Sequence, residues 1–327
     1  MHTRRQTVRK AVFPVAGFGT RFLPATKACP KEMLPVVDKP LIQYAVEEAA
    51  AAGITEMIFV TGRNKRAIED HFDRAYELEK ELEAAGKTDT LRELRNALPS
   101  GLTYSYVRQP EMRGLGDAVL CAASLVGDEP FAVILPDDII DAEIPAMRQM
   151  VELYEQTRSS VVAVERVDPA EAHRYGVIKP ESAAGGPVQR LADLVEKPKP
   201  GTAPSSLAIV GRYILSPAVF ELLRMLQSRT AKGELQLTDG IRGLLGLESV
   251  LGYEFEGVRY DCGTKIGHLQ AQVWYALKRP ELRDQFASYL RQLSWRPRQK
   301  APAVHRDEPS RAWSKSTNPL RVVSERD

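Results

Sequence analysis

The sequence is poor in cysteine, in long apolar runs and in excess charge of either sign. Its three cysteines, Cys29, Cys121 and Cys262, are widely separated and form no CxxC pair, which excludes a disulfide-stapled fold and gives no sign of a zinc site. Lys and Arg number 45 against 43 Asp and Glu, so the net charge of +2 indicates neither nucleic-acid nor anionic-membrane binding. No apolar run approaches the length of about 18 residues that is typical of a membrane-spanning helix. We therefore expect a cytoplasmic protein with no nucleic-acid or membrane partner.

The chain of 327 residues is long enough for two domains or one large α/β unit. Short apolar runs alternate with helical patterns over its first 170 residues. The predicted strands are residues 11–15, 55–61, 102–108, 131–135 and 160–167. The predicted helices are residues 41–52, a helix capped by Asn64, an exposed helical excursion at 74–96, and stretches after Asp117 and Pro145. This alternation predicts a mostly parallel central sheet flanked by helices on both faces.

The pattern becomes strand-rich after about residue 170. Further strands are predicted at residues 175–179, 188–196, 207–215 and 251–256. Two amphipathic helices, 266–277 and 281–293, follow them. From residue 295 to 327 the composition turns to Pro, Ser and Arg, which predicts a basic disordered tail.

A glycine turn follows the first predicted strand. Gly17 and Gly19 stand where backbone N–H groups can approach a phosphate closely. Arg21 and Lys31 come next, in a loop stiffened by four prolines at positions 24, 30, 35 and 40. A stiff loop that carries these two cations predicts a triphosphate clamp. A dinucleotide site is disfavoured because the third glycine of its motif is missing, and the P-loop pattern is absent from the sequence.

Acidic residues follow other predicted strands. Asp137 follows the strand at 131–135, and together with Asp261 it would offer two carboxylates to one Mg²⁺ ion. For Asp138 we favour a role as the cap of the next turn. Glu196 and Lys197 end the strand at 188–196; in a cleft, Glu196 can accept from sugar hydroxyls while Lys197 meets a phosphate.

Several of these segments, in this order, resemble a known family. The matching runs begin with PVAGFGTRFLPATK at 14–27 and PKEMLPVVDKPLIQY at 30–44. They continue with GLG at 114–116, LPD at 135–137, VEKP at 195–198, AIVGRY at 208–213, QLTD at 236–239 and DCG at 261–263. On these motifs the chain is identified as a member of the bacterial UTP–glucose-1-phosphate uridylyltransferases, within the sugar nucleotidyltransferase family.

The resemblance implies a Rossmann-like nucleotidyltransferase fold over residues 8–290. It implies a nucleotide-binding half at 8–170, a smaller strand-rich sugar-binding insertion at 171–262 and C-terminal helices at 263–294. The implied reaction joins UTP and α-D-glucose 1-phosphate into UDP-glucose and pyrophosphate, with Mg²⁺ as cofactor. The family suggests a homodimer or homotetramer, with the two closing helices as the contact surface.

The resemblance also implies a role for each matching residue. The backbone of Ala16 and Gly17 and the side chain of Gln109 would read uracil, with Gly114 beside the nucleoside. Arg21 and Lys31 would hold the phosphates, and Lys197 the sugar phosphate. Asp137 and Asp261 would ligate Mg²⁺. Glu196 and the Gly176 backbone would bind glucose. No Ser, Cys or His is needed as a nucleophile, because the attacking group is an ionised phosphate oxygen.

One departure and two alternatives stand beside this interpretation. Asp117 replaces the His that usually follows GLG in the family, and we favour a helix cap for it. A glucose-1-phosphate thymidylyltransferase would share the glycine turn and the EKP element. Its base, thymine, differs from uracil by one methyl group, and an apolar pocket discriminates such a difference by only about 1–3 kcal/mol. A non-catalytic relative that binds nucleotide sugars and regulates a partner enzyme is the other alternative.

Overall fold

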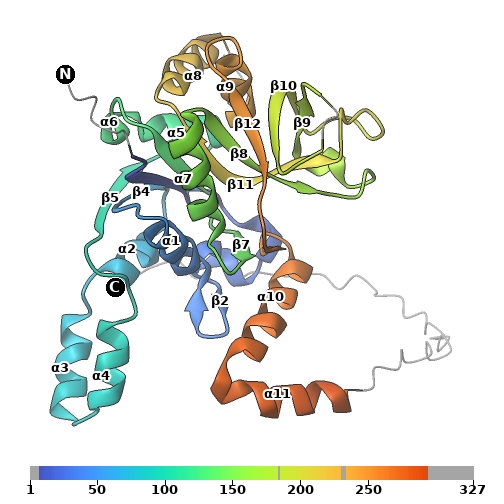
Figure 1. The fold of residues 1–327 in the computed structure, drawn as a ribbon. Coiled ribbons are helices and arrows are strands. Elements are labelled where there is room, and N and C mark those ends of the chain that lie inside the picture. The colour runs from blue at the N-terminus through green and yellow to red at the C-terminus, as the bar shows by residue number, and fades with distance from the viewer. Residues whose placement is uncertain (1–6, 183–184, 230–232, 294–327) are drawn as a thin grey trace, which may run out of the picture.

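One mixed sheet organises the protein, in a computed structural model that describes residues 7–182, 185–229 and 233–293. Figure 1 shows its helices and strands. In spatial order the nine strands are β5 (Thr103–Arg108), β4 (Glu56–Thr61), β1 (Lys10–Pro14), β6 (Phe131–Ile134), β11 (Leu207–Leu215), β8 (Ser160–Arg166), β12 (Val250–Glu254), β10 (Val188–Glu196) and β9 (Gly176–Pro180).

The first four strands in this order are parallel, as the alternating sequence predicts. Strand β11 then runs antiparallel to both β6 and β8, and β12 is parallel to β8. Strands β10 and β9 continue antiparallel at the far edge. Because β11 lies between two strands from the first half of the chain, the strand-rich segment shares the sheet of that half.

Helices cover both faces of the sheet. Helices α1, α2 and α7 contribute to the core on one face, and α5, α8 and α9 to the core on the other. The helices of the described chain are α1 (Leu41–Ala51), α2 (Arg66–Phe72), α3 (Tyr76–Ala84), α4 (Thr88–Arg95), α5 (Leu115–Cys121), α6 (Ala123–Val126), α7 (Ala146–Thr157), α8 (Ala218–Arg229), α9 (Leu237–Leu244), α10 (Lys265–Lys278) and α11 (Pro280–Gln292). Phe13 packs into the core with Ile42 of α1 and Met147 of α7, whereas its neighbour Val12 packs into the core with Phe220 of α8. The apolar run of β1 therefore reflects a strand buried on both faces.

The helical excursion predicted at 74–96 forms the hairpin of α3 and α4. It projects from the body beside α2 (Figure 1). Its buried Glu79 accepts hydrogen bonds from Arg74 and Arg95 at 2.8–2.9 Å. Both guanidinium groups act together to lower the pKa of Glu79 to about 2, so this exposed hairpin is held at its base by a fixed carboxylate.

Two predicted helix caps are wrong. Asn64 has a left-handed backbone with φ of 67°, and α2 begins after Lys65 without a side-chain cap. Asn tolerates this conformation better than most residues, which explains its place in the turn. Helix α5 begins at Leu115, directly after Gly114, so Asp117 lies inside its first turn instead of before it.

Other elements escaped the sequence analysis or lie outside the described residues. Helices α8 and α9 were not predicted, nor was the two-stranded sheet of β7 (Asp138–Asp141) and β13 (Val258–Asp261). A short hairpin joins β2 (Pro35–Val36) to β3 (Lys39–Pro40) in the proline-braced loop. The tail predicted at 295–327 lies outside the described residues.

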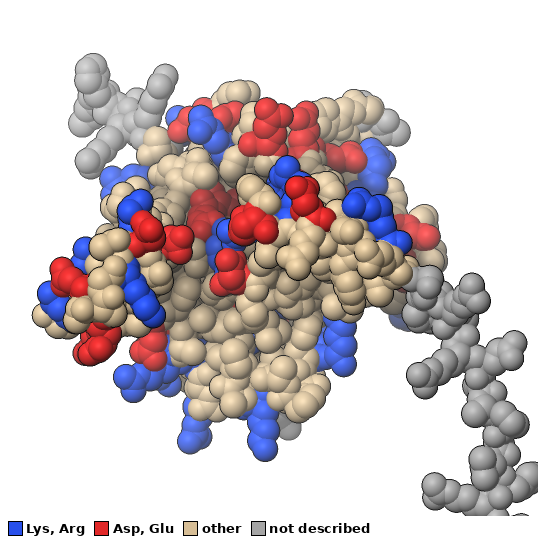
Figure 2. Space-filling model, turned by 90° about the horizontal axis from the view of Figure 1, so that it is seen from below, with Lys and Arg blue, Asp and Glu red and all other residues tan. Residues whose placement is uncertain are grey.

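The C-terminal helices form an arm at the end of the described chain (Figure 1). Thr264 caps α10, because its side chain accepts from the backbone N–H of Gly267. Gln272 ties this helix to the β2–β3 hairpin through Pro35 and Val37. Basic and acidic side chains are interspersed on the face seen from below in Figure 2. No helix within the described ranges is both long and apolar enough to cross a bilayer.

Arg212 is the largest fully buried side chain of the described chain, with 1% of its surface exposed. Its guanidinium forms a two-pronged ion pair with Glu48 of α1, at 2.9 and 2.8 Å. It also donates to the carbonyl oxygens of Leu135 at 3.0 Å and Asp138 at 2.7 Å. These bonds join β11, α1 and the turn after β6 at one point.

We predict that Arg212→Leu lowers the free energy of unfolding by about 3–5 kcal/mol, because Glu48 is left buried without its partner. Urea denaturation followed by circular dichroism measures the change. Arg148→Leu is the control: Arg148 forms an exposed pair with Glu152, and its loss changes stability by less than about 1 kcal/mol. Equal effects of the two substitutions would contradict a central role for Arg212.

Candidate active site

A cavity of about 400 Å³ opens where segments from both halves of the chain meet. Its wall includes residues that follow β6, the ends of β10 and β13, Arg21 from the loop after β1, and the start of α9. Six of the residues selected from the sequence line this cavity: Arg21, Asp137, Gly176, Glu196, Lys197 and Asp261. Residues more than 200 positions apart in the sequence thus share one site.

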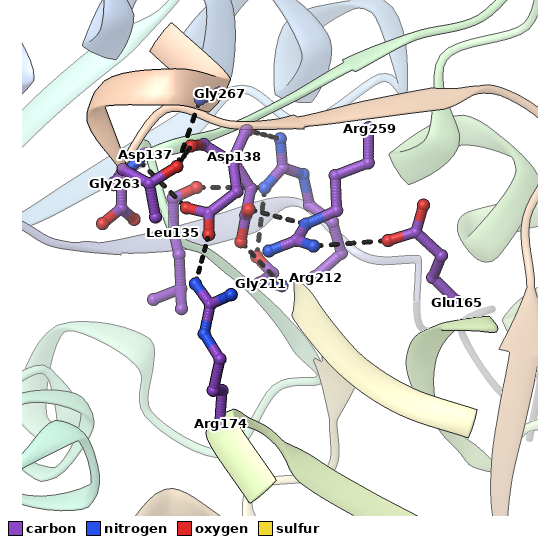
Figure 3. Close-up of polar contacts among 12 residues, drawn as sticks. Leu135, Asp137, Asp138, Glu165, Arg174, Gly211, Arg212, Arg259, Gly263 and Gly267 are labelled. Carbon is purple, nitrogen blue, oxygen red and sulfur yellow. Dashed lines mark hydrogen bonds and ion pairs between the residues drawn. The ribbon is translucent and has the colours of Figure 1, made fainter. Parts of the chain in front are cut away.

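The two predicted metal-binding acids converge. Asp137 follows β6, and Asp261 ends β13, which pairs antiparallel with β7 so that Asp261 lies opposite Asp138. A Cβ atom placed on Gly263 would lie 3.0 Å from an oxygen of Asp137 and 3.0 Å from an oxygen of Asp261. The two carboxylate oxygens are therefore no farther apart than twice that distance. Figure 3 labels Asp137 and Gly263 at this turn.

Arg21 reaches the same point from the other side. A Cβ atom on Gly263 would lie 3.4 Å from Nη1 of Arg21, which donates to the Gly263 carbonyl oxygen at 3.3 Å. Arg21 belongs to a 3-10 turn (Thr20–Phe22) that begins after Gly19. Gly19 has φ of 65°, and an added Cβ would lie 2.9 Å from that of Lys31. Glycine at position 19 therefore lets the two halves of the cationic loop pack together.

Lys31 contacts Asp137 directly, with 2.5 Å between Nζ and Oδ2. Burial, the largest single effect, acts to lower the pKa of Lys31, but the negative charges of Asp137 and Glu32 and the hydrogen bond to Asp137 together outweigh it, so the pKa is raised overall. Burial is also the largest effect on Asp137 and acts to raise its pKa, but the charge and hydrogen bond of Lys31, a backbone hydrogen bond and the charge of Arg21 together lower that pKa. Both groups are therefore charged at neutral pH.

Glu196 and Lys197, at the end of β10, also line the cavity. Lys197 has a left-handed backbone with φ of 43°, and its N–H donates to the carbonyl oxygen of Tyr175 at 3.0 Å. Its side chain is 60% exposed, with Nζ 3.5 Å from Glu196 Oε1, while Thr238 donates to Glu196 Oε2 at 3.1 Å. A strained conformation of this kind is typical of functional sites. Gly176 lies beside Glu196, where an added Cβ would stand 3.2 Å from Oε2.

The residues proposed to bind the base lie outside the wall of this cavity. Ala16 and Gln109 are buried at the carboxyl ends of β1 and β5, and Gly17 follows Ala16. Gly114 directly precedes α5 with φ of 98°, and an added Cβ would lie 2.6 Å from the Leu235 carbonyl oxygen. The next residue, Leu115, does line the cavity, so this group borders the site.

Asp138 is no cap, contrary to the interpretation from sequence. It begins β7, and its buried carboxylate accepts from Arg259 Nε at 2.7 Å and from the Gly211 N–H at 3.3 Å. Arg259 also reaches Glu165 at 3.3 Å (Figure 3). Burial raises the pKa of Asp138. This ion pair lies beside both proposed metal ligands, because Asp138 follows Asp137 and Arg259 precedes Asp261 by two positions.

Two arginines of the cavity wall were missed by the sequence analysis. Arg259 joins the strands that carry the acids, and Arg174 points toward Asp261, with 3.7 Å between Nη2 and Oδ2 (Figure 3). Neither lies in a motif, and the sequence alone does not distinguish an isolated arginine in a site from one exposed to solvent. Arg259 could have been suspected from its place two residues before Asp261.

The acids suit a hard divalent cation that completes its coordination with other oxygens. No cluster of three or more His, Cys, Asp or Glu ligands occurs among the residues described here. Two converging carboxylates beside Arg21 match the way Mg²⁺ is bound, by one or two carboxylates together with waters and phosphates. The donor set thus fits a metal that is shared with a phosphorylated ligand.

Comparison with known proteins places this chain in a family. The sequence pattern of the nucleotidyl transferase family matches residues 10–276. The chain belongs to the nucleotidyl transferase family. The UTP–glucose-1-phosphate uridylyltransferase of Bacillus subtilis (strain 168) is 52% identical to this transferase over 284 residues, which are 86% of this chain and 96% of the relative. The resemblance stated from the sequence is thereby confirmed.

Solved structures confirm the fold of this transferase. A UTP-bound UGPase from Acinetobacter baumannii superposes with a TM-score of 0.81 at 41% identity, covering 88% of this chain and 100% of that one. A UDP-glucose pyrophosphorylase complexed with UDP-glucose superposes with a TM-score of 0.74 at 46% identity, covering 83% and 100%. The nucleotidyltransferase fold predicted from the sequence is therefore correct.

Proposed function

We propose that this transferase joins UTP and α-D-glucose 1-phosphate into UDP-glucose and pyrophosphate. The observation that carries the proposal is the convergence of Asp137, Asp261 and Arg21 around Gly263. Two carboxylates and a guanidinium at one point suit a metal-bound polyphosphate. The names and ligands of the relatives described above supply the identity of the two substrates.

The reaction brings two anions together. The phosphate oxygen of the sugar phosphate attacks the α-phosphorus of UTP in line, the new P–O bond forms, and the bond to pyrophosphate breaks with its electron pair. The nucleophile is already ionised, so positioning and charge neutralisation supply the catalysis. Within the described residues Arg21 forms no ion pair, and its only hydrogen bond goes to the Gly263 carbonyl. Its charge is thus available to the departing pyrophosphate, beside Lys31.

The sugar phosphate enters from the side of β10. Lys197 neutralises its phosphate, because this side chain is exposed and lines the same cavity as Asp137 and Asp261. Glu196, held by Thr238, accepts from glucose hydroxyls together with the backbone of Gly176. This arrangement divides the single domain at 8–290 into a nucleotide-binding half (8–170), a sugar-binding half (171–262) and C-terminal helices (263–294).

Uracil is read at the neighbouring edge of the sheet. The backbone of Ala16 and Gly17 and the side chain of Gln109 contact the base, and Gly114 lies beside the nucleoside. Mg²⁺ is the cation we propose for Asp137 and Asp261. When bound, it neutralises charge on the phosphates of the nucleotide.

We propose that the enzyme is cytoplasmic and acts as a homodimer or homotetramer. The C-terminal arm exposes apolar side chains that no described residue covers. On α10 and just after α11 these include Ile266 at 64% exposure, Leu269 at 60% and Leu293 at 55%. A second copy of the chain would remove this apolar surface from water.

We expect UTP to be the preferred nucleotide in a pyrophosphate-release assay with glucose 1-phosphate and each of UTP, dTTP, CTP, ATP and GTP. A preference for dTTP would indicate the thymidylyltransferase instead. Release with none of the five nucleotides would support a non-catalytic regulatory relative. The charged residues of the cavity favour the enzyme, because Arg21, Lys31, Asp137, Glu196, Lys197 and Asp261 are all present.

Lys197→Ala should reduce turnover by a factor on the order of 100 or more, because a desolvated phosphate loses its counter-charge. The melting temperature should stay near that of the wild type, since the side chain is exposed. The matched control is Lys199→Ala, another exposed lysine two positions away, which should keep full activity. Wild-type turnover in Lys197→Ala would remove this residue from the mechanism.

Removal of divalent cations with EDTA should abolish pyrophosphate release, and added Mg²⁺ should restore it. The reason is that phosphates crowded beside Asp137 and Asp261 need a compensating cation. Circular dichroism in EDTA checks that the fold persists. Full turnover in the chelator would exclude a metal role for the two acids.

A further inference from the structure

The side chain of Gln109 is fixed before any ligand arrives. It follows β5, its backbone N–H donates to the carbonyl oxygen of Thr61 at 2.9 Å, and only 5% of the residue is exposed. Its Nε2 donates to the carbonyl oxygen of Gly114 at 3.2 Å and to Oδ2 of Asp117 at 2.8 Å. Both partners can only accept, so the amide must turn its NH₂ toward them.

This leaves one group of the amide for a ligand. Both hydrogens of Nε2 are used, and no hydrogen bond within the described part of the chain reaches Oε1. Gln109 therefore presents an acceptor and no side-chain donor. A rotated amide would place its oxygen against the Asp117 carboxylate, which has no hydrogen to give.

Asp117 is itself held in place. It lies in the first turn of α5 with 6% of its surface exposed. Its second oxygen, Oδ1, accepts from Nε2 of Gln227 on α8 at 2.9 Å. Two elements, the end of β5 and the helix α8, thus donate to one carboxylate.

We propose that Asp117 is a positioning residue that makes the enzyme select uracil over cytosine, by holding Gln109 with its carbonyl oxygen toward the base. The proposal rests on the function and base site proposed above. Uracil carries N3–H as the single donor on its pairing edge, and Oε1 accepts from it. Cytosine has an unprotonated N3 there, whose lone pair opposes the fixed oxygen. An amide free to rotate would lose this distinction by turning its NH₂ toward N3.

The experiment compares two substitutions of the same residue. Asp117→Leu keeps a similar size and removes the acceptor, whereas Asp117→Asn keeps a carbonyl oxygen for Gln109 and offers its NH₂ to a rotated Gln227. We measure kcat/KM for UTP and for CTP, or the inhibition constant of CTP where it is not turned over. The UTP-to-CTP ratio should fall about tenfold or more in Asp117→Leu, mainly through KM, the effect of one mispaired buried polar group. It should stay within about threefold in Asp117→Asn.

Two further variants separate positioning from folding. Gln227→Leu removes the other bond to Asp117 and should leave the ratio unchanged. Gln109→Leu should itself lower the ratio, and adding Asp117→Leu to it should lower the ratio no further, because Asp117 acts through Gln109. Melting temperatures show which variants are folded, and Asp117→Ala replaces Asp117→Leu if the latter does not fold.

The outcomes are distinct from those of the proposed function. If the wild-type enzyme releases no pyrophosphate with UTP, the proposed function fails. If it does, the positioning role is overturned by an unchanged ratio in Asp117→Leu or in Gln109→Leu. An equal fall in Asp117→Asn, in Gln227→Leu, or on top of Gln109→Leu overturns it as well, because the effect would then be structural.

Discussion

The buried guanidinium of Arg212 is the constraint on which the site depends. It pairs with Glu48 on α1 and donates to the carbonyl oxygens of Leu135 and Asp138, the residues that flank the turn bearing Asp137. A turn held from both sides cannot swing its carboxylate away. The acid that approaches Asp261 is therefore positioned by the core of the protein, and little reorganisation is needed when substrates bind.

Charge in the cavity is largely compensated before any ligand enters. Three ion pairs between distant segments border it: Lys31 with Asp137, Arg259 with Asp138, and Arg174 with Asp261. Each pair joins segments that are distant in the sequence, so the same contacts build the site and neutralise it. Against this background Arg21 and the exposed Lys197 supply the positive charge that two phosphorylated substrates need. The even mixture of charges on the outside, by contrast, gives no long-range attraction for anions.

The sequence predicted well where one local signal decides the structure. Apolar runs between turn residues located β10 and β11 at their observed limits, and glycine with proline located the cationic loop. The predictions from sequence were wrong where contacts between distant residues decide the structure. In the sequence Asp117 resembles a helix cap, but its carboxylate accepts hydrogen bonds from Gln109 and Gln227. Asp138 resembles a turn residue, but it begins a strand and pairs with Arg259, over a hundred positions away. The short strands β7 and β13 exist because they pair with each other.

The position of β11 also governs how the chain can be made. During synthesis the parallel strands β5, β4, β1 and β6 emerge first, yet the free edge of β6 finds its neighbour only when residues 207–215 leave the ribosome. Until then an apolar, unpaired strand edge is exposed to other nascent chains. The gap of more than 70 residues between these partners prolongs the time for which this edge stays unpaired during synthesis.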